Sequence, residues 1–325
     1  MEEGLSGRAK TRPSPEERRQ VKRERREDPA YSDRRSRTFW ALVLFAAFFA
    51  VTAAVDAYRC AHGFVVTEYE FETDKVSGPV NIVMVSDLHE SEFGKDNADL
   101  VSKIRELEPD IILCVGDMIT RTVSDDRLHI GLDFMAEMAK IAPTYMSLGN
   151  HEDIYVKRHG PGIIDTLKSS GVIILDQEYA DVEAAGQTIR IGGIYGYCFR
   201  YGQKKEEYYA SDKYRFFTEL CDTDAYRILL CHRPVDYRLE SEITLFEDWD
   251  IDLVLSGHTH GGLWQLPFIG SPYLPQQGFL PKLDKGLKDV GRANMIIGAG
   301  LGSENGLFRL NNPCELVVIR LLPNE

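Results

Sequence analysis

The sequence predicts an α/β protein whose body is preceded by a charged tail and one apolar segment. Two observations predict the body: from about Pro79 onward, short apolar runs alternate with stretches of helical spacing, and the chain is long enough for a large buried core. A third observation, the apolar run from Phe39 to Val55, predicts a single transmembrane helix before the body. With 325 residues, the body forms either one large domain or two ordinary ones.

Residues 1–37 form the charged tail. They carry 12 Lys+Arg against 8 Asp+Glu, a net charge of +4, whereas the whole chain carries −13, so the remaining residues carry −17. A segment this rich in charge buries too little apolar surface to fold alone, and we expect it to be disordered. The acidic body is a poor electrostatic match for nucleic acid, so we expect no nucleic-acid partner.

Residues 38–56 are predicted to be a transmembrane signal anchor. Between Phe39 and Val55 the only polar residue is Thr52, and basic residues such as Arg37 precede the run. The positive-inside rule then leaves the tail in the cytoplasm and sends the body to the extracytoplasmic side. A buried helix and a cleaved signal peptide are the alternatives, the latter because small residues such as Ala53, Ala54 and Ala57 follow the apolar core.

Residues 57–78 are predicted to be a linker and first strand region, and residues 79–325 a β-α-β-α-β series continued by further strands. The expected strands are VNIVMVSD, DIILCVGD, PTYMSLGNHE, TIRIGGIYGY, AYRILLCHRP, DIDLVLSGHTH, ANMIIGAG and CELVVIRLL, and the expected helices are NADLVSKIRELEPD and DDRLHIGLDFMAEMAKI. Six cysteines are widely spaced, and Cys114 and Cys231 lie within apolar runs, so we expect buried thiols rather than a disulfide framework.

Five of these strands end in residues that can bind metal. In chain order these residues are Asp87 and His89, Asp117, Asn150 and His151, His232, and finally His258 and His260. In a sheet of this type the carboxyl ends of the strands meet at one edge. Each residue alone has an ordinary explanation as a turn or cap, but their joint occurrence at successive strand ends favours a metal site.

The motifs DLH, GD, GNHE, CH and GHTH occur in this order, and together they resemble the calcineurin-like metallophosphoesterases over about residues 79–325. The resemblance implies one domain of two packed mixed β-sheets flanked by helices. It also implies two divalent cations, Mn, Fe or Zn, with Asp87, His89 and His260 on one, Asn150, His232 and His258 on the other, and Asp117 bridging them. Such a pair would hydrolyse a phosphoric ester through a metal-bridged hydroxide.

Four further residues are considered beside these ligands. His151 is expected to protonate the leaving oxygen or to stabilise the charged transition state, as the resemblance implies, with Glu152 or Asp153 orienting it. Arg233 directly follows His232 and is a candidate phosphate contact, although a surface ion pair explains it equally well.

The aromatic-rich loop after the last two ligands is either a packed cover over the sheet or a lipid-facing lip. Its apolar residues are Trp264, Leu266, Phe268, Ile269, Tyr273, Leu274, Phe279 and Leu280. This loop, the segment QGFLPK and the C-terminal FRLNNPCELVVIRL are similar to those of a membrane-associated bacterial branch of the superfamily, some members of which cleave the pyrophosphate of UDP-diacylglucosamine.

We therefore expect a membrane-anchored phosphoesterase that hydrolyses a phosphodiester or pyrophosphate in an envelope lipid or wall precursor. Its partners would be the lipid bilayer and a phosphate-containing, lipid-linked substrate. The alternatives are a general phosphomonoesterase or protein phosphatase, a nuclease, which the acidic body disfavours, and a catalytically silent metal-binding scaffold, which the full ligand set disfavours.

Overall fold

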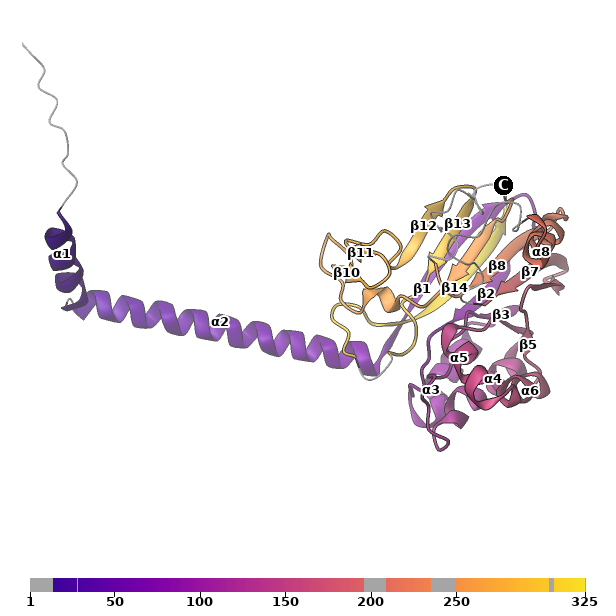
Figure 1. Cartoon of the computed structure of the whole chain (residues 1–325), viewed down its shortest axis with the longest axis horizontal. Helices are drawn as coiled ribbons and strands as arrows, with labels where there is room; N and C mark the ends of the chain where they lie inside the picture. The colour runs from indigo at the N-terminus through magenta and orange to yellow at the C-terminus, as the bar shows by residue number, and fades with distance from the viewer. Residues whose placement is uncertain (1–13, 28, 196–208, 235–248, 304–306, 325) are drawn as a thin grey trace, which may run out of the picture. The chain divides into compact units, whose positions relative to one another are not determined.

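The computed structural model of the chain describes residues 14–27, 29–195, 209–234, 249–303 and 307–324 (Figure 1). The chain divides into two units, Met1–Val55 and Asp56–Glu325. The second unit, here called the body, contains every residue predicted to bind metal.

Within the first unit, the tail is helical where it is described, contrary to the predicted disorder. Helix α1 spans Pro15–Glu27. A reciprocal cap starts it: the backbone N–H of Glu17 donates to Ser14 Oγ (3.2 Å), and the Ser14 N–H donates to the Glu17 carboxylate (2.7 Å). Strong helix formers such as Arg, Glu, Lys and Gln then continue the helix. It forms without a core, because its described side chains are all exposed.

Helix α2 spans Pro29–His62 and contains the predicted anchor. Among the described residues, Ser36–His62 is one stretch long and apolar enough to cross a membrane, and none of its most apolar window is buried. A buried core helix is therefore excluded as an explanation of the run, and a membrane anchor is supported. The helix extends beyond the predicted boundary at residue 56, because nothing in the sequence breaks it before Gly63.

The body contains two six-stranded sheets. The first has the order β1 (Phe64–Thr73), β14 (Cys314–Pro323), β2 (Val80–Val85), β3 (Ile111–Cys114), β4 (Thr144–Met146) and β5 (Ile173–Ile174). The second has the order β12 (Gly286–Val290), β13 (Ala293–Ile297), β9 (Leu253–Ser256), β8 (Tyr226–Cys231), β7 (Gln187–Ile194) and β6 (Glu178–Ala184). A separate small hairpin pairs β10 (Tyr273–Leu274) with β11 (Gly278–Phe279).

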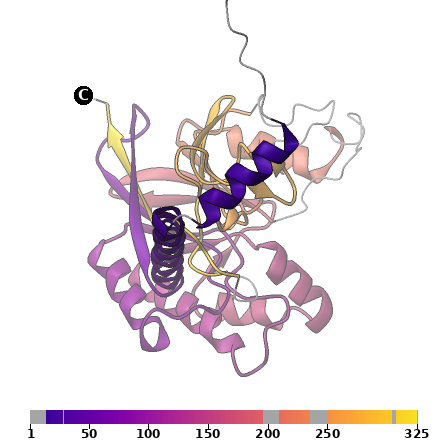
Figure 2. The same cartoon turned by 90° about the vertical axis from the view of Figure 1, so that its left-hand side faces the viewer.

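Strand direction brings the functional ends together. β2 to β5 are mutually parallel, and so are β7, β8, β9 and β13. β14 runs antiparallel to β2 and parallel to β1, while β6 and β12 form antiparallel edges, so both sheets are mixed. In Figure 2, β14 runs beside β1 out to the C-terminus.

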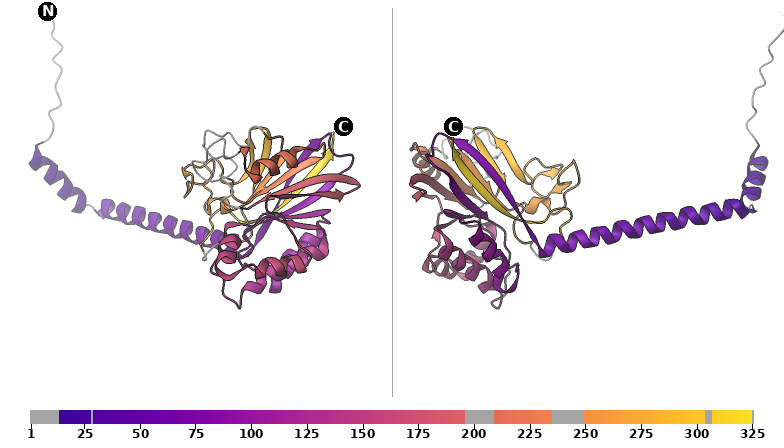
Figure 3. Two further views of the ribbon diagram at one scale, coloured as in Figure 1. Left: turned by 45° about the vertical axis from the view of Figure 1, so that its right-hand side comes forward. Right: turned by 180° about the vertical axis from the view of Figure 1, so that it is seen from behind.

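The helices lie outside the paired sheets. These are η1 (Lys95–Asn97), α3 (Ala98–Glu106), α4 (Leu128–Ile141), α5 (Asn150–His159), α6 (Gly162–Ser169), α8 (Asp212–Cys221) and the short η3 (His260–Gly262). Figure 3 shows the helices α4 to α6 on one side of the first sheet, away from the second sheet.

Alternating strand residues build the layers. Ile82 of β2 and Ile228 of β8 belong to one buried cluster, which lies between the sheets. Val83, which follows Ile82, instead packs in a second cluster with residues of α3, α4 and α6. A third cluster holds α8 against the second sheet through Phe217. The sequence of layers is thus helix, sheet, sheet, helix, which confirms the predicted fold class.

The body begins before the predicted boundary at residue 79. β1 is the edge strand of the first sheet and pairs along its whole length with β14, so Phe64–Thr73, within the predicted linker and first strand region, is an integral strand of the body. The prediction of buried thiols is confirmed for Cys114 and Cys231, which are free and buried, as are Cys60 and Cys314; Cys221 is free and half-buried. Cys198 lies outside the described residues.

Candidate metal centre

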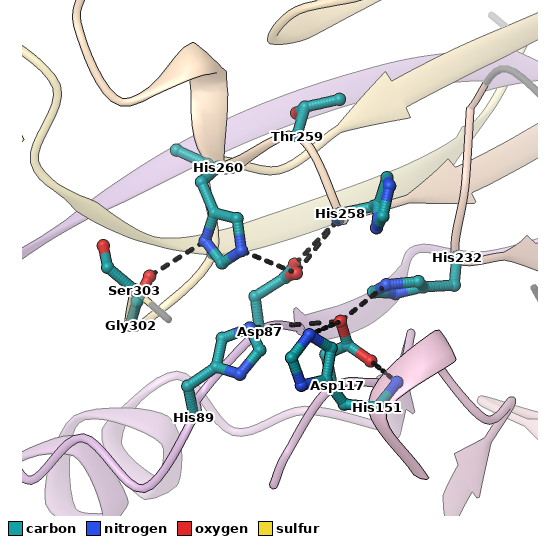
Figure 4. Close-up of polar contacts among 12 residues, drawn as sticks. Asp87, His89, Asp117, His151, His232, His258, Thr259, His260, Gly302 and Ser303 are labelled. Carbon is teal, nitrogen blue, oxygen red and sulfur yellow. Dashed lines mark hydrogen bonds and ion pairs between the residues drawn. The ribbon is translucent and has the colours of Figure 1, made fainter. Parts of the chain in front are cut away.

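The ends of five strands deliver the predicted ligands to one place (Figure 4). Asp87 and His89 follow β2, and Asp117 follows β3. Asn150 and His151 open α5 just after β4. In the second sheet, His232 follows β8, and His258 and His260 follow β9.

Most of these ligands have an unusual backbone conformation. Five of the seven predicted ligands have positive φ: Asp87 (51°), His89 (48°), Asp117 (56°), His258 (69°) and His260 (49°). Left-handed backbone is uncommon for residues with a side chain and costs on the order of 1–3 kcal/mol at each position. Such a concentration of strained residues is typical of functional sites, where the surrounding fold holds side chains in directions that relaxed strands would not give.

Glycines make room for the acidic ligands. A side chain at Gly149 would place its Cβ 2.0 Å from Asp117 Oδ1, and one at Gly257 would place it 2.3 Å from Asp87 Oδ2. Neither position therefore tolerates a larger residue without displacing a carboxylate. The chemistry of the GNH and GHTH motifs thus depends on their glycines as well as on their ligands.

The side chains form overlapping groups of potential ligand atoms. Asp87, His89 and His260 form one group, and Asp117, His232 and His258 form another, with the atoms of each group within 4.8 Å of one another. A third group, His89, Asp117 and His151, overlaps the first two. Asp117 Oδ2 lies 3.0 Å from His232 Nε2 and 3.9 Å from His89 Nε2, so this carboxylate lies between the imidazoles. His258 and His260, only two residues apart, contribute to different groups.

Hydrogen bonds on the far side of the rings select the ligand atoms. His260 Nδ1 lies 3.0 Å from the carbonyl oxygen of Gly302, and His232 Nδ1 lies 2.5 Å from that of Val115. A carbonyl only accepts, so Nδ1 must carry the proton in both rings. Nε2 is then left with a free lone pair facing the carboxylates, which is the form of imidazole that binds metal.

His258 faces the site with its other nitrogen. Its Nε2 lies 3.1 Å from Gln276 Oε1 and 2.8 Å from Gln276 Nε2. Because Gln276 occupies Nε2, the group that includes Asp117 receives Nδ1. Sequence reasoning missed Gln276, since it lies 18 residues away in the hairpin of β10 and β11 and carries no motif.

In His151 the proton is on the opposite ring nitrogen. Its Nδ1 accepts a hydrogen bond from the backbone N–H of Arg121 (2.9 Å), so the neutral ring carries its proton on Nε2. That Nε2 lies 3.9 Å from Asp117 Oδ2 and faces the centre. A protonated nitrogen cannot bind a cation, which separates His151 from the ligand histidines beside it.

Among the buried atoms that have no hydrogen-bond partner within the described residues are Asn150 Oδ1 and His89 Nε2. Both belong to predicted ligands, and leaving such atoms unsatisfied in a protein interior costs on the order of 1–3 kcal/mol each. A cation bound to them would remove that cost. The donor set of carboxylate, amide oxygen and imidazole fits Mn, Fe or Zn.

The electrostatics of the site depend on the Asp117–His232 pair. Burial alone lowers the pKa of His232, but the Asp117 carboxylate outweighs burial and raises the pKa to about 10. Burial likewise raises the pKa of Asp117, yet His232 outweighs it and holds the pKa well below its usual range. Burial and the charge of His232 lower the pKa of His258 to about 3. A bound cation would take the place of the proton on His232.

Glu152 has a different role from the one predicted. Its carboxylate does not orient His151 but accepts four backbone N–H groups, from Asp117 (2.8 Å), Met118 (2.6 Å), Ile119 (3.2 Å) and Gly149 (2.9 Å). It therefore ties the loop after β3 to the loop after β4.

Asp153 does not orient His151 either. Its carboxylate accepts from Lys157 Nζ (2.6 Å), one helical turn later, in an ordinary ion pair along α5. The backbone of Arg121 supplies the orientation instead. Such a contact has no side-chain signature in a sequence.

Arg309 is a second residue that sequence reasoning missed, and it is buried. It is 1% exposed and donates to the carbonyl oxygens of Ala299 (2.7 Å) and Gly302, and its Nε donates to Ser303 Oγ (3.0 Å). It thereby fixes the loop whose Gly302 carbonyl orients His260. The glycine-rich GAGLG after β13 was a sequence signal that another tight loop meets this edge.

Arg233 remains a predicted substrate contact. It lies close enough to His258 that its charge, after burial and the charge of His232, helps to lower the pKa of that ring. It is therefore near the centre, as its place directly after His232 suggested.

The sequence pattern of the calcineurin-like phosphoesterase family matches residues 80–262, more than half of the chain, and the chain therefore belongs to this family. Phosphodiesterase YaeI of Escherichia coli (strain K12) is 28% identical over 248 residues, which cover 76% of this chain and 83% of that protein. An uncharacterised metallophosphoesterase of Aquifex aeolicus (strain VF5) is 28% identical over 293 residues, covering 84% and 98%. A transmembrane protein with metallophosphoesterase domain from Danio rerio is 29% identical over 250 residues, covering 73% and 55%.

This membership makes the chain a metal-dependent hydrolase of phosphoric esters, as the motifs predicted. The family match ends at Gly262, directly after the last predicted ligand. It therefore covers all the ligand groups described above. The number and identity of the metals and the choice of substrate are questions for the site itself.

Replacing Asp117 by asparagine should remove most of the bound metal, because the two ligand groups that share this carboxylate would both lose its negative charge. Metal per protein in the purified full chain, measured by mass spectrometry, should fall well below the wild-type value, and hydrolysis should fall with it. Asp96→Asn, an exposed acid outside the site, is the matched control and should leave both unchanged. Full metal content in Asp117→Asn would contradict a shared ligand.

Glu152→Gln should destabilise the body, because the amide nitrogen would oppose backbone N–H groups that now donate to a carboxylate. The free energy of unfolding in denaturant should fall by about 1–3 kcal/mol, with weaker metal retention. Glu137→Gln on α4 is the control, because it makes the same change in an exposed ion pair, with Lys140, that should contribute less than about 1 kcal/mol. Equal stability of the two variants would refute the tie between the loops.

Proposed function

We propose that the chain is a membrane-anchored phosphoesterase that uses two divalent cations to cleave a phosphodiester or pyrophosphate bond. One observation carries this proposal: Asp117 belongs to two ligand groups at once, and its Oδ2 lies 3.9 Å from His89 Nε2 of the first sheet and 3.0 Å from His232 Nε2 of the second. A carboxylate in this position is suited to bridge two cations.

The residues that would hold the cations divide around Asp117. Asp87, His89 and His260 would hold one, and Asn150, His232 and His258 the other. Bound cations would supply Lewis-acid chemistry, drawing charge from the phosphoryl oxygens and acidifying water. The chain contributes rigidity, since the carbonyls of Val115 and Gly302 fix two of the rings.

His151 is the proposed proton donor. Its Nε2–H faces the site because the backbone N–H of Arg121 occupies Nδ1, so the proton lies on the side where a leaving oxygen develops charge. Donating that proton neutralises the oxygen as its bond to phosphorus breaks. His151 is buried, which excludes water as a competing donor at this position.

A cavity of about 510 Å³ adjoins His89 and gives room for a second substituent on the phosphorus. Its lining is mostly polar, with Glu90, Thr120 and Arg127 on one side and Ser303 on another. A phosphomonoester has one organic group, whereas a diester or pyrophosphate has two, so a polar space next to the centre favours the latter. A general phosphomonoesterase or protein phosphatase is the second candidate.

The location of the substrate follows from the anchor. Helix α2 supplies a candidate span, and only Gly63 separates its last residue from β1, the edge strand of the first sheet. A catalytic body attached by so short a connection stays near the bilayer, which favours a lipid-linked phosphate in the envelope or a wall precursor. The basic tail before the span favours a cytoplasmic tail and an extracytoplasmic body.

The test is a parallel assay of the full chain, purified in detergent and supplemented with Mn, Fe or Zn. The substrates are a phosphomonoester, a simple phosphodiester, a phosphoprotein and a pyrophosphate-linked sugar lipid. We expect turnover of the diester or pyrophosphate to exceed that of the monoester and the phosphoprotein. The reverse order would favour the second candidate, and no hydrolysis with any metal would favour a silent scaffold.

His151→Ala should retain the metals yet lower turnover by roughly 10²- to 10⁴-fold on a substrate with an alkyl leaving group, the range for a lost general acid. On a nitrophenyl ester, whose leaving group needs no proton, the loss should be much smaller. His159→Ala, in the same helix but exposed, is the control for the substitution. An equal loss on both substrates would contradict proton donation.

Protease added to intact cells or protoplasts should cleave the body and spare the tail, because the positive-inside rule leaves the tail in the cytoplasm. Release of the protein from membranes should require detergent. A body protected until lysis would show the opposite orientation. A body freed by salt or alkali alone would show that the apolar segment is cleaved or does not span.

A further inference from the structure

The loop between η3 and β12 exposes large apolar side chains to solvent. We call this surface the apolar lip; it consists of Trp264, Leu266, Phe268, Ile269, Tyr273, Phe279 and Leu280, all of which are exposed. Phe268 is completely exposed and Phe279 is 84% exposed. Leu274 alone of the predicted residues is buried, so the loop is not a packed cover over the sheet.

The apolar lip is an ordered structure. β10 pairs with β11, and the N–H of Leu266 donates to the carbonyl of Gly270 (2.9 Å). The Asp284 carboxylate fastens the base of the loop by accepting from the N–H of Ser271 (3.1 Å) and from Gln265 Nε2 (3.2 Å). Many polar groups of the loop therefore form hydrogen bonds within the loop, while its apolar side chains are exposed to solvent. A protein surface that enters lipid needs its polar groups hydrogen-bonded within the protein in this way, because lipid offers them no partners.

The charge of this segment differs from that of the rest of the body. Residues 261–283 contain no Asp or Glu and a single charged residue, Lys282, in a chain with 51 acidic residues and a net charge of −13. Anionic headgroups would repel most of such a body. The acid-free segment is the part that can approach them, and its Trp, Tyr and Phe residues are those enriched at membrane interfaces.

The apolar lip is also joined to the first residue of the body. Asn311 donates through its backbone N–H to Asp56 Oδ2 (2.5 Å) and through Nδ2 to the carbonyl of Gln265 (2.9 Å). Asp56 directly follows the apolar run that ends at Val55. Trp264 forms an isolated parallel β-bridge with Leu310. The centroid of the Trp264 ring lies 5.2 Å from the centroid of the Phe308 ring, and Phe308 is itself exposed.

We propose that the apolar lip inserts into the surface of the lipid bilayer and gives the body a second membrane contact beside its anchor. The bond through Asn311 keeps the apolar lip next to Asp56, which directly follows the apolar run, so the apolar lip and the anchor would reach the same bilayer. His260 begins η3 directly before the apolar lip, so insertion would hold the metal centre close to the membrane surface. This contact does not depend on the proposed reaction.

The test places a nitroxide spin label on a cysteine at position 268 or 279 in the full chain. The protein is reconstituted into bilayers of phosphatidylethanolamine and phosphatidylglycerol, and collisions of the label with oxygen and with a water-soluble nickel chelate are measured. Phe268 is fully exposed, so its replacement removes no internal contact. Ile173→Cys on β5, the edge of the first sheet opposite β1, is the matched control, and the unsubstituted chain gives the background from native cysteines.

We expect labels at 268 and 279 to meet oxygen several-fold more often, relative to the nickel chelate, than the label at 173. Labels at 268 and 279 that collide with the chelate as freely as the one at 173 would overturn the proposal. Labels shielded from both reagents would also overturn it, since they would indicate burial against a second copy or another protein. Because the measurement involves no hydrolysis, either result leaves the proposed reaction to be judged separately.

Discussion

The fold depends on burying the carboxylate of Asp117 among three imidazoles. Many contacts around this carboxylate offset the free-energy cost of burying its charge. An isolated buried charge costs far more than a protein can supply, so it must be paired. His232 at 3.0 Å supplies one partner, and the backbone N–H of His151 donates to the other oxygen (2.8 Å). The Asp117 backbone is also held, by Glu152. His232 follows β8 of the second sheet, whereas His151 and Glu152 follow β4 of the first, so the two sheets must meet in one register for the site to exist.

Glu152 illustrates how the same constraint organises residues that touch no ligand atom. Desolvation raises its pKa to about 7, the proximity of Asp117 contributes in the same direction, and the backbone N–H groups act against both. Burying the Glu152 carboxyl so close to Asp117 is unfavourable, so Glu152 must stabilise the structure through its contacts enough to offset that cost. It does so by closing two strand-end loops into one rigid unit, which carries Asp117 and Asn150 at a fixed separation.

The sequence predicted the elements whose residues repeat with a clear period, and it predicted the ligands because each followed such an element. β2, β3, β8 and β9 are mostly apolar, so their bounds could be predicted and the polar residues that follow them were easily recognised. A first strand was predicted between residues 57 and 78 but without bounds, because β1 is an edge strand with alternating Glu, and α1 was missed because it buries nothing. The partners of the imidazole nitrogens are mostly backbone carbonyls and amides, which every residue possesses. No pattern of side chains could have identified them, so the tautomers, which support the separate role predicted for His151, required coordinates.

The histidines show why geometry decides chemistry here. All five are the same side chain within one small volume, yet hydrogen bonds to Val115, Gly302 and Gln276 free one nitrogen of three rings for a cation. The N–H of Arg121 does the reverse for His151 and leaves a proton facing the same space. Exchanging a carbonyl for an amide at one of these positions would convert a ligand into a proton donor without changing the motif. The motif therefore specifies which atoms are available, and the loops that the two sheets bring together specify what each of them does.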